Sequence, residues 1–274
     1  MNARAFLVRG LLVGLLAGFA AFLVAHEVGE PHVERAIALE EAGAAAEAPV
    51  EAPLEAPLEQ ADHSHEDGTA AHSHGDEGTS VSRPDQRTWG LATGTIAIGV
   101  ALGGIVALIA AAAVGRLGRL TPRQSTATVA LVGFTALALV PFLKYPAATP
   151  AVGSGDTIGD RTGYYFLFLL ISLAVAIGAM ALGLRLWQKL GAFEAVAIAA
   201  VGYAAIMVVV GEVMPTVNEV GDFPADELWF FRRASLFTLV ALWAVLGLGL
   251  TALVGRLHQQ TATVQARREF AASL

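Results

Sequence analysis

Six long apolar runs constrain the fold of this chain more than any other feature of its sequence. Each run comes close to the roughly 20 residues that an α-helix needs to cross the hydrocarbon core of a membrane. The runs show no alternation of apolar and polar residues, so helices and not β-strands are the spanning form we expect. They cover residues 6–25, 91–114, 126–143, 164–187, 195–214 and 234–254. The sequence therefore predicts an all-α, polytopic transmembrane bundle of about six helices within the lipid bilayer.

Two of the runs carry glycines spaced four residues apart. This G-x-x-x-G spacing places small residues on one face of a helix and permits close contact with a neighbouring helix. The glycines concerned are Gly10, Gly14 and Gly18 in the first run, and the pairs Gly90/Gly94 and Gly99/Gly103 in the second. We expect these faces to pack against a helix of the same chain or of a partner, which leaves a homo-oligomer open.

The distribution of charge predicts the orientation of the bundle. Ten of the 17 lysines and arginines lie before the first run, in alternate connections and in the C-terminal tail, whereas 22 of the 24 acidic residues lie on the opposite side. Basic residues favour the cytoplasmic side of a membrane. We therefore expect a multi-pass protein of the inner (plasma) membrane with both termini in the cytoplasm. The net charge of −7 is concentrated in the outer loops, where it attracts cations and indicates no nucleic-acid partner.

The first run permits a second interpretation. Arg4 and Arg9 precede its apolar stretch, as in a cleaved signal peptide, although no A-x-A cleavage pattern lies near Ala25. We expect the run to be retained as a transmembrane span. The chain then divides into the first span with its outer mouth (1–40), an acidic, histidine-rich extracytoplasmic loop (41–87), a five-span bundle (88–258) and a cytoplasmic tail (259–274).

The long outer loop carries the clearest metal signal. Its repeat EAPVEAPLEAPLE, residues 47–59, is rich in proline and glutamate, so we expect a disordered spacer. Two His-Ser-His motifs follow, each with acidic residues after it, and their histidines are His63, His65, His72 and His74. Imidazole and carboxylate groups in a flexible segment suit Zn, Ni, Co or Cu(II), and favour capture over selection. The alternative is a low-complexity tract that only keeps the loop soluble.

A second group of metal-type ligands follows the first span and comprises His26, Glu27, Glu30 and His32. On a helix that continues outward, His26 and Glu30 lie one turn apart on the same face. Pro31 is expected to end or bend that helix and to turn His32 back toward them. The alternative is an ordinary set of charged residues at the edge of a span.

A third group follows the fifth span. Glu212 lies at or just inside the membrane, where an ionisable group is costly and is a candidate for function, unless it simply reaches the headgroup region. Asn218 and Glu219 follow in the outer loop, and their oxygens suit the replacement of part of a cation's hydration shell. We expect Lys144 and Arg161, in the preceding outer loop, to neutralise these carboxylates when no ion is bound.

Several function classes lack their signature in this sequence. The chain has neither a nucleotide-binding P-loop nor an H-E-x-x-H metal motif, so we expect neither an enzyme nor an ATP-driven pump. It has no cysteine, which removes disulfides and thiolate ligands and disfavours Cu(I). Transport would then use the membrane potential, an ion gradient or a partner. We expect no tightly bound cofactor, only a transported or bound divalent metal ion.

Several segments resemble signature segments of the CbtA family of predicted cobalt transporter subunits. They are PFLKYPAATPAVG (141–153), TIGDRT (157–162) and PTVNEVGDFPADELWFFRRASLFT (215–238). GEPHVERAIALEE (29–41) and VALGGIVALIAAAAVGRLGRLTPR (100–123) extend the resemblance over nearly the whole chain apart from the spacer. The resemblance implies a membrane subunit for cobalt uptake, linked to cobalamin synthesis, that acts beside CbtB, a small single-span protein with a histidine-rich end.

Residues and resemblance together predict uptake of cobalt, or of nickel or zinc, with capture by the outer loop. The metal ligands we expect are His26, Glu30, His32, His63, His65, His72, His74, Glu212, Asn218 and Glu219. The alternative function is a non-transporting metal sensor or an accessory scaffold of a transport complex.

Overall fold

The computed structural model describes residues 2–47 and 81–273, and helices form all the regular secondary structure of these two stretches. Six helical segments in them are long and apolar enough to cross a membrane, one for each predicted run. They are Ala3–Ala44, Arg83–Ala113, Pro122–Lys144, Gly155–Leu190, Ala192–Val213 and Ala225–Ala272. The predicted all-α transmembrane bundle is therefore confirmed.

Several of these segments contain more than one helical element. The first comprises α1 (Ala3–Val24), the π-helical turn η1 (Ala25–Gly29) and α2 (Glu30–Glu47). The second comprises α3 (Arg83–Asp85), the π-helical turn η2 (Gln86–Gly90) and α4 (Leu91–Ala113). The third comprises α5 (Pro122–Phe134), the π-helical turn η3 (Thr135–Leu139) and α6 (Val140–Lys144). The others are the 3-10 turn η4 (Gly155–Thr157), α7 (Ile158–Leu190), α8 (Ala192–Val213) and α9 (Ala225–Ala272).

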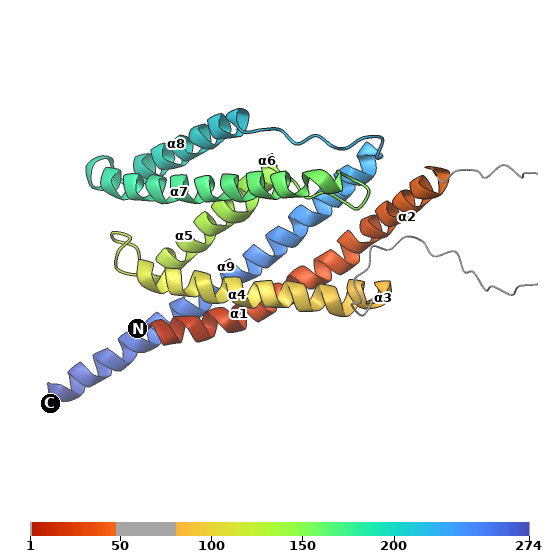
Figure 1. Ribbon diagram of the computed structural model, residues 1–274. Helices are drawn as coiled ribbons and strands as arrows, with labels where there is room; N and C mark the ends of the chain where they lie inside the picture. Colours follow the sequence, from red (N-terminus) through yellow and green to blue (C-terminus); the bar gives the residue numbers. More distant parts are fainter. Residues whose placement is uncertain (1, 48–80, 274) are drawn as a thin grey trace, which may run out of the picture.

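The helices pack in two groups (Figure 1). In one group α1 lies along α4 and α9, and in the other α7 and α8 pack on each other as a hairpin. The third segment joins them, because α5 packs on α9 while η3 and α6 contact α7. Both termini lie at the same end of the bundle, opposite the end where α2 leaves and α3 begins (Figure 1). An even number of spans requires this arrangement of the termini.

The contact between α1 and α4 brings two helix backbones together. The residues in this contact are Gly10, Gly14 and Gly18 on α1 and Gly99 and Gly103 on α4. A Cβ atom added to Gly18 would lie 2.6 Å from the Cα of Ile96, and one added to Gly103 would lie 2.7 Å from the Cα of Gly14. Carbon atoms in favourable contact are about 3.5–4.0 Å apart, so only glycine fits here. The prediction of close packing is confirmed for these five glycines, and the partner helix belongs to the same chain.

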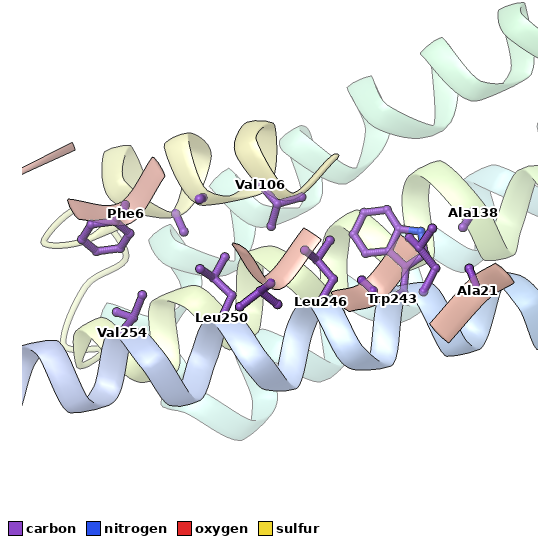
Figure 2. Close-up of a cluster of buried hydrophobic side chains, with 13 residues drawn as sticks. Phe6, Ala21, Val106, Ala138, Trp243, Leu246, Leu250 and Val254 are labelled. Atoms are coloured by element: carbon purple, nitrogen blue, oxygen red, sulfur yellow. The ribbon is translucent and has the colours of Figure 1, made fainter. Parts of the chain in front are cut away.

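The main core fills the space where α1, α4 and α9 meet (Figure 2). Phe6 of α1, Val106 of α4 and Leu250 of α9 are almost completely buried in it. In the same core, Trp243 of α9 packs on Phe134 of α5, with 6.3 Å between the ring centroids. Lipid tails are as apolar as these side chains, so close packing stabilises this core within the membrane more than the removal of water does.

π-helical turns lie beside the proline of three segments. Pro31 follows η1, Pro84 precedes η2 and Pro141 follows η3. Proline has no N–H group and its ring collides with the carbonyl four residues earlier, and a wider turn just before Pro31 and Pro141 relieves both conflicts. Pro84 lies in the first turn of α3, where no helical hydrogen bond is lost, so η2 is not explained in this way. Of the expected end or bend at Pro31, the end is wrong, because the first segment runs on through η1 into α2.

The carbonyl that Pro141 leaves without a partner is used to join two helices. Hydrogen bonds in η3 run to the carbonyl five residues back, as from Val140 to Thr135, so the Ala136 carbonyl would need the N–H that Pro141 lacks. The buried Ser172 hydroxyl of α7 donates to this carbonyl at 2.8 Å and lies 2.8 Å from the Tyr203 hydroxyl of α8. This bond satisfies a polar group inside the membrane, where an unpaired one is costly.

Helices extend past the expected borders of the long outer loop. α2 continues to Glu47 and α3 begins at Arg83, so residues 41–47 and 83–87 are helical and not part of a disordered loop. The Ser82 side chain caps α3 by accepting a hydrogen bond from the Asp85 N–H. The repeat at 47–59, apart from Glu47, and the histidine motifs lie outside the described residues.

Replacing Gly103 with alanine should lower the free energy of unfolding by about 1–3 kcal/mol, because the new methyl group meets the backbone of α1. Gly94→Ala on the same helix is the matched control, since a Cβ there has no neighbour within 4 Å. The predicted Gly90/Gly94 face thus makes no close helix contact in the described chain. Gly94→Ala should leave stability unchanged or raise it by up to about 1 kcal/mol. Unfolding in detergent, followed by tryptophan fluorescence, measures the free energy of unfolding of both variants. Equal changes in Gly103→Ala and Gly94→Ala would contradict the packing described.

Candidate functional site

A cavity of about 730 Å³ lies at the end of the bundle opposite the termini. Its wall is formed by the start of α2, the loop after α6, the start of α7, the loop after α8 and the first turns of α9. It therefore lies between the group of α1, α4 and α9 and the group that contains α7. In the orientation predicted from the charge distribution, this end of the bundle is the outer one.

Five charged side chains line this cavity among many apolar ones. They are Glu30, Lys144, Arg161, Glu219 and Arg232. Two of them, Glu30 and Glu219, are residues that the sequence predicted as metal ligands, and two more, Lys144 and Arg161, were predicted to neutralise carboxylates. The structure thus brings four predicted residues from distant parts of the chain to one cavity.

Glu219 is held in place by the loop before α7. One of its oxygens, Oε2, accepts hydrogen bonds from the Thr157 hydroxyl at 2.8 Å and from the Ser154 N–H at 3.2 Å. The same oxygen lies 3.5 Å from the Arg161 Nε. The predicted neutralisation of a carboxylate by Arg161 is thus present at Glu219. The loop after α8 and the start of α7 are joined through this one carboxylate.

These contacts keep the Glu219 carboxyl ionised. The Thr157 hydroxyl lowers the pKa of Glu219 below its ordinary value of 4.5, and the Ser154 N–H and the Arg161 charge lower it further. Partial burial raises the pKa of Glu219, but by less than these three contacts lower it. A hydrogen bond or positive charge beside a carboxyl favours the ionised form, which is also the form that binds a cation.

Lys144 has a different role from the one expected. Its Nζ donates to the Met214 carbonyl at 3.2 Å and lies 3.4 Å from the Thr216 hydroxyl. Lys144 therefore ties the end of α6 to the loop after α8, and it forms no ion pair with a carboxylate of the described chain.

Glu30 is paired with an arginine that the sequence analysis did not single out. The Arg83 Nη2 lies 2.6 Å from the Glu30 Oε2, and this pair is mostly shielded from solvent. A second pair, Arg87 with Glu34, joins the same two segments. The start of α2 is thus fixed against α3 and η2 by two ion pairs, and Glu30 is the one whose side chain lines the cavity.

The histidines of the second predicted group are separated in the structure. The His26 ring stacks on Phe22 and its Nδ1 lies 3.2 Å from the Arg87 carbonyl oxygen. The His32 Nδ1 lies 3.2 Å from the Glu227 Oε2, which also accepts from Arg35. Pro31 does not turn His32 back toward His26, because the helix continues as α2. In the described residues no three His, Cys, Asp or Glu side chains are close enough to hold a metal ion together.

The remaining predicted ligands lie away from the cavity or outside the described residues. Glu212 and Asn218 are exposed and neither lines the cavity wall. The histidines of the long outer loop, His63, His65, His72 and His74, lie outside the described residues. Of the six predicted ligands among the described residues, the cavity contains Glu30 and Glu219.

The model of one protein family matches residues 3–255, nearly the whole chain. That family is described as "Probable cobalt transporter subunit (CbtA)". The chain belongs to the CbtA family. No curated protein and no solved structure matches it. The CbtA match includes every residue that lines the cavity as well as the close contact of α1 with α4. Its six apolar helices and its membership in CbtA make this chain a multi-pass membrane protein.

Replacing Thr157 with valine should raise the pKa of Glu219 toward its ordinary value, because the largest pKa-lowering contact is lost. In the wild type, the stabilisation that comes from the ionised form is complete above pH 4.5 and is lost only as the pH falls through the lowered pKa. In Thr157→Val, protonation of the Glu219 carboxylate should begin at higher pH, and the stabilisation is lost with it. An acid titration of the infrared carboxylate band measures the pKa of Glu219 in both proteins. The spectrum of Glu219→Gln is subtracted to isolate the band of this one carboxylate.

The matched control for this titration is Thr216→Val, which removes a threonine hydroxyl that lies near Lys144 and not near Glu219. It should leave the titration of Glu219 unchanged. An unchanged titration in Thr157→Val as well would contradict the described contacts of Glu219.

Proposed function

We propose that this chain is the membrane subunit that takes up cobalt, or a similar divalent ion such as nickel or zinc, from the outer side of the inner membrane. The observation that carries the proposal is the match of the CbtA family over residues 3–255. The cavity with its two carboxylates gives the proposal a place for the ion to enter. The ion is cargo, and we propose neither a resident cofactor nor a catalytic step.

Glu30 and Glu219 supply the first oxygen ligands at the cavity. Carboxylate oxygens are suitable ligands for a divalent ion that gives up part of its hydration shell. The contacts of Glu219 with Ser154, Thr157 and Arg161 all involve its Oε2, which leaves Oε1 to bind an incoming ion. Before the ion arrives, Arg83 and Arg161 neutralise the two carboxylates, which prevents the cost of a buried unpaired charge.

The histidines of the long outer loop, and those that follow the first span, bind the ion before it reaches the cavity. His63, His65, His72 and His74 raise the concentration of the ion near the membrane, and His26 and His32 receive it at the outer ends of the helices. Glu212 and Asn218 contribute oxygen atoms at the membrane edge of the same face. Imidazole binds cobalt, nickel and zinc without strong preference, so this stage favours capture over selection.

The membrane potential is sufficient to drive the ion inward. Two positive charges gain about 4.6 kcal/mol per 100 mV, at about 2.3 kcal/mol for each charge. This direction requires both termini in the cytoplasm and the cavity outside, as the distribution of lysine and arginine favours. A small single-span CbtB-like subunit is the proposed partner, a homo-oligomer is compatible with the same function, and cobalamin synthesis is the proposed destination of the metal.

Replacing Glu30 or Glu219 with glutamine should reduce cobalt uptake by about tenfold or more, because each change removes a charged ligand. Asp222→Asn is the matched control, since Asp222 is an exposed carboxylate of the same outer loop that does not line the cavity. Accumulation of radioactive cobalt in cells that also express a CbtB-like partner measures the effect. Uptake that falls equally in all three variants, or in none, would contradict the role of the cavity.

Removing residues 62–78 should lower uptake at scarce cobalt and leave it nearly unchanged at high cobalt, because a capture segment matters only when the ion is dilute. The same variant tests the alternative function. A metal sensor or an accessory scaffold would accumulate no cobalt itself and would lose its response to metal at every concentration. Uptake that is abolished at high cobalt as well would show that the segment does more than capture the ion.

A further inference from the structure

The charges that line the cavity are not balanced. Both carboxylates already have an arginine beside them, Glu30 with Arg83 and Glu219 with Arg161. Arg232 and Lys144 line the same wall, and neither forms an ion pair with a described carboxylate. The cavity therefore presents positive charge beyond what its own carboxylates neutralise.

Arg232 is the less satisfied of these two cations. Its Nε is shielded from solvent and has no hydrogen-bond partner among the described residues. Lys144, in contrast, donates to the Met214 carbonyl. A guanidinium group is always charged and presents its N–H donors in a planar fork that matches the oxygens of a carboxylate or phosphate. A shielded donor of this kind without a partner calls for an acceptor that enters from outside.

Other groups on the wall complete a site for such an acceptor. Ser235 lies three residues after Arg232 on α9, hence on the same helix face, and also lines the cavity. Much of the remaining wall is apolar, with Leu137, Phe142 and Val220 among its residues. The cavity thus combines an anion-binding corner with walls that suit a hydrocarbon chain.

We propose that this cavity binds a phosphate group through Arg232, with Ser235 and Lys144 as further donors. A phosphate has enough oxygens to accept from all three side chains at once, whereas a carboxylate has two. The group comes either from the headgroup of a membrane phospholipid or from free phosphate. This site concerns an anion and uses side chains other than the proposed metal ligands, so it does not depend on the proposed function.

The test uses the full chain, purified in a phosphate-free maltoside detergent. Phosphatidylglycerol and inorganic phosphate are the two probes, and diacylglycerol, which lacks the phosphate, is the control for the lipid. Retained lipid is counted by native mass spectrometry, and binding of inorganic phosphate is measured by calorimetry. We expect the wild type to bind one or both phosphate probes in preference to diacylglycerol, and the probe that binds identifies the source of the group.

Arg232→Gln should weaken binding about tenfold or more, because it removes charge-assisted hydrogen bonds. Arg233→Gln is the matched control, since Arg233 is the next residue of the same helix, stacks on Phe230 with its guanidinium carbon 4.9 Å from the ring centroid, and does not line the cavity. It should bind like the wild type. Ser235→Ala, a milder change that keeps all charges, should weaken binding about threefold and serves if Arg232→Gln does not fold.

Two results would overturn the site. One is a wild-type chain that binds neither phosphate probe better than diacylglycerol. The other is a failure of the variants to separate as predicted, whether by equal weakening in Arg232→Gln and Arg233→Gln or by unchanged binding in both Arg232→Gln and Ser235→Ala. Since cobalt is absent from this experiment, its failure would leave the uptake proposal untouched, and the failure of cobalt uptake would leave the phosphate site untouched.

Discussion

The backbone contact between α1 and α4 is the interaction on which the rest of the structure depends. Glycines on both helices let them approach so closely that a single added methyl group would collide with backbone atoms. α1 continues through η1 into α2, and α4 is preceded by α3 and η2, so this one contact also sets α2 beside α3 and η2. The pairing of Glu30 with Arg83 follows from it. One wall of the cavity is therefore fixed by packing deep in the membrane.

The opposite wall is fixed by hydrogen bonds instead. The Ser172 hydroxyl joins α7 to the carbonyl that Pro141 leaves free, and the Glu219 carboxylate joins the loop after α8 to the start of α7. In the membrane such bonds have no water to compete with them, whereas at the outer surface charge supplies part of their strength. α8 packs mainly on α7. This construction gives the cavity one wall held by close backbone contact and one held by a small apolar cluster together with a few polar bonds.

Particular residues explain how much the sequence could predict. The six spans and the packing glycines follow from hydrophobic length and glycine spacing, which are local properties. The meeting of Glu219 with Arg161 was expected, because the sequence predicted these opposite charges on the same side of the membrane. The pairing of Glu30 with Arg83 was not predicted, because no local pattern joins Arg83, at the far end of the long loop, to Glu30. The expectation that Pro31 turns His32 back toward His26 failed, because the helix continues through a π-helical turn into α2. Arg232 was missed, because one arginine at the edge of a span resembles ordinary interfacial charge.

Cobalt binding by the chain without residues 62–78 tests most directly whether the cavity, and not only the histidine-rich loop, receives the ion. The measurement is equilibrium binding to the purified protein, with X-ray absorption at the cobalt edge to identify the ligands. Our account predicts a bound ion with oxygen ligands, whose affinity falls when Glu219 is replaced by glutamine. A shortened chain that binds no cobalt, or that binds it equally well with and without the Glu219 carboxylate, would contradict the account.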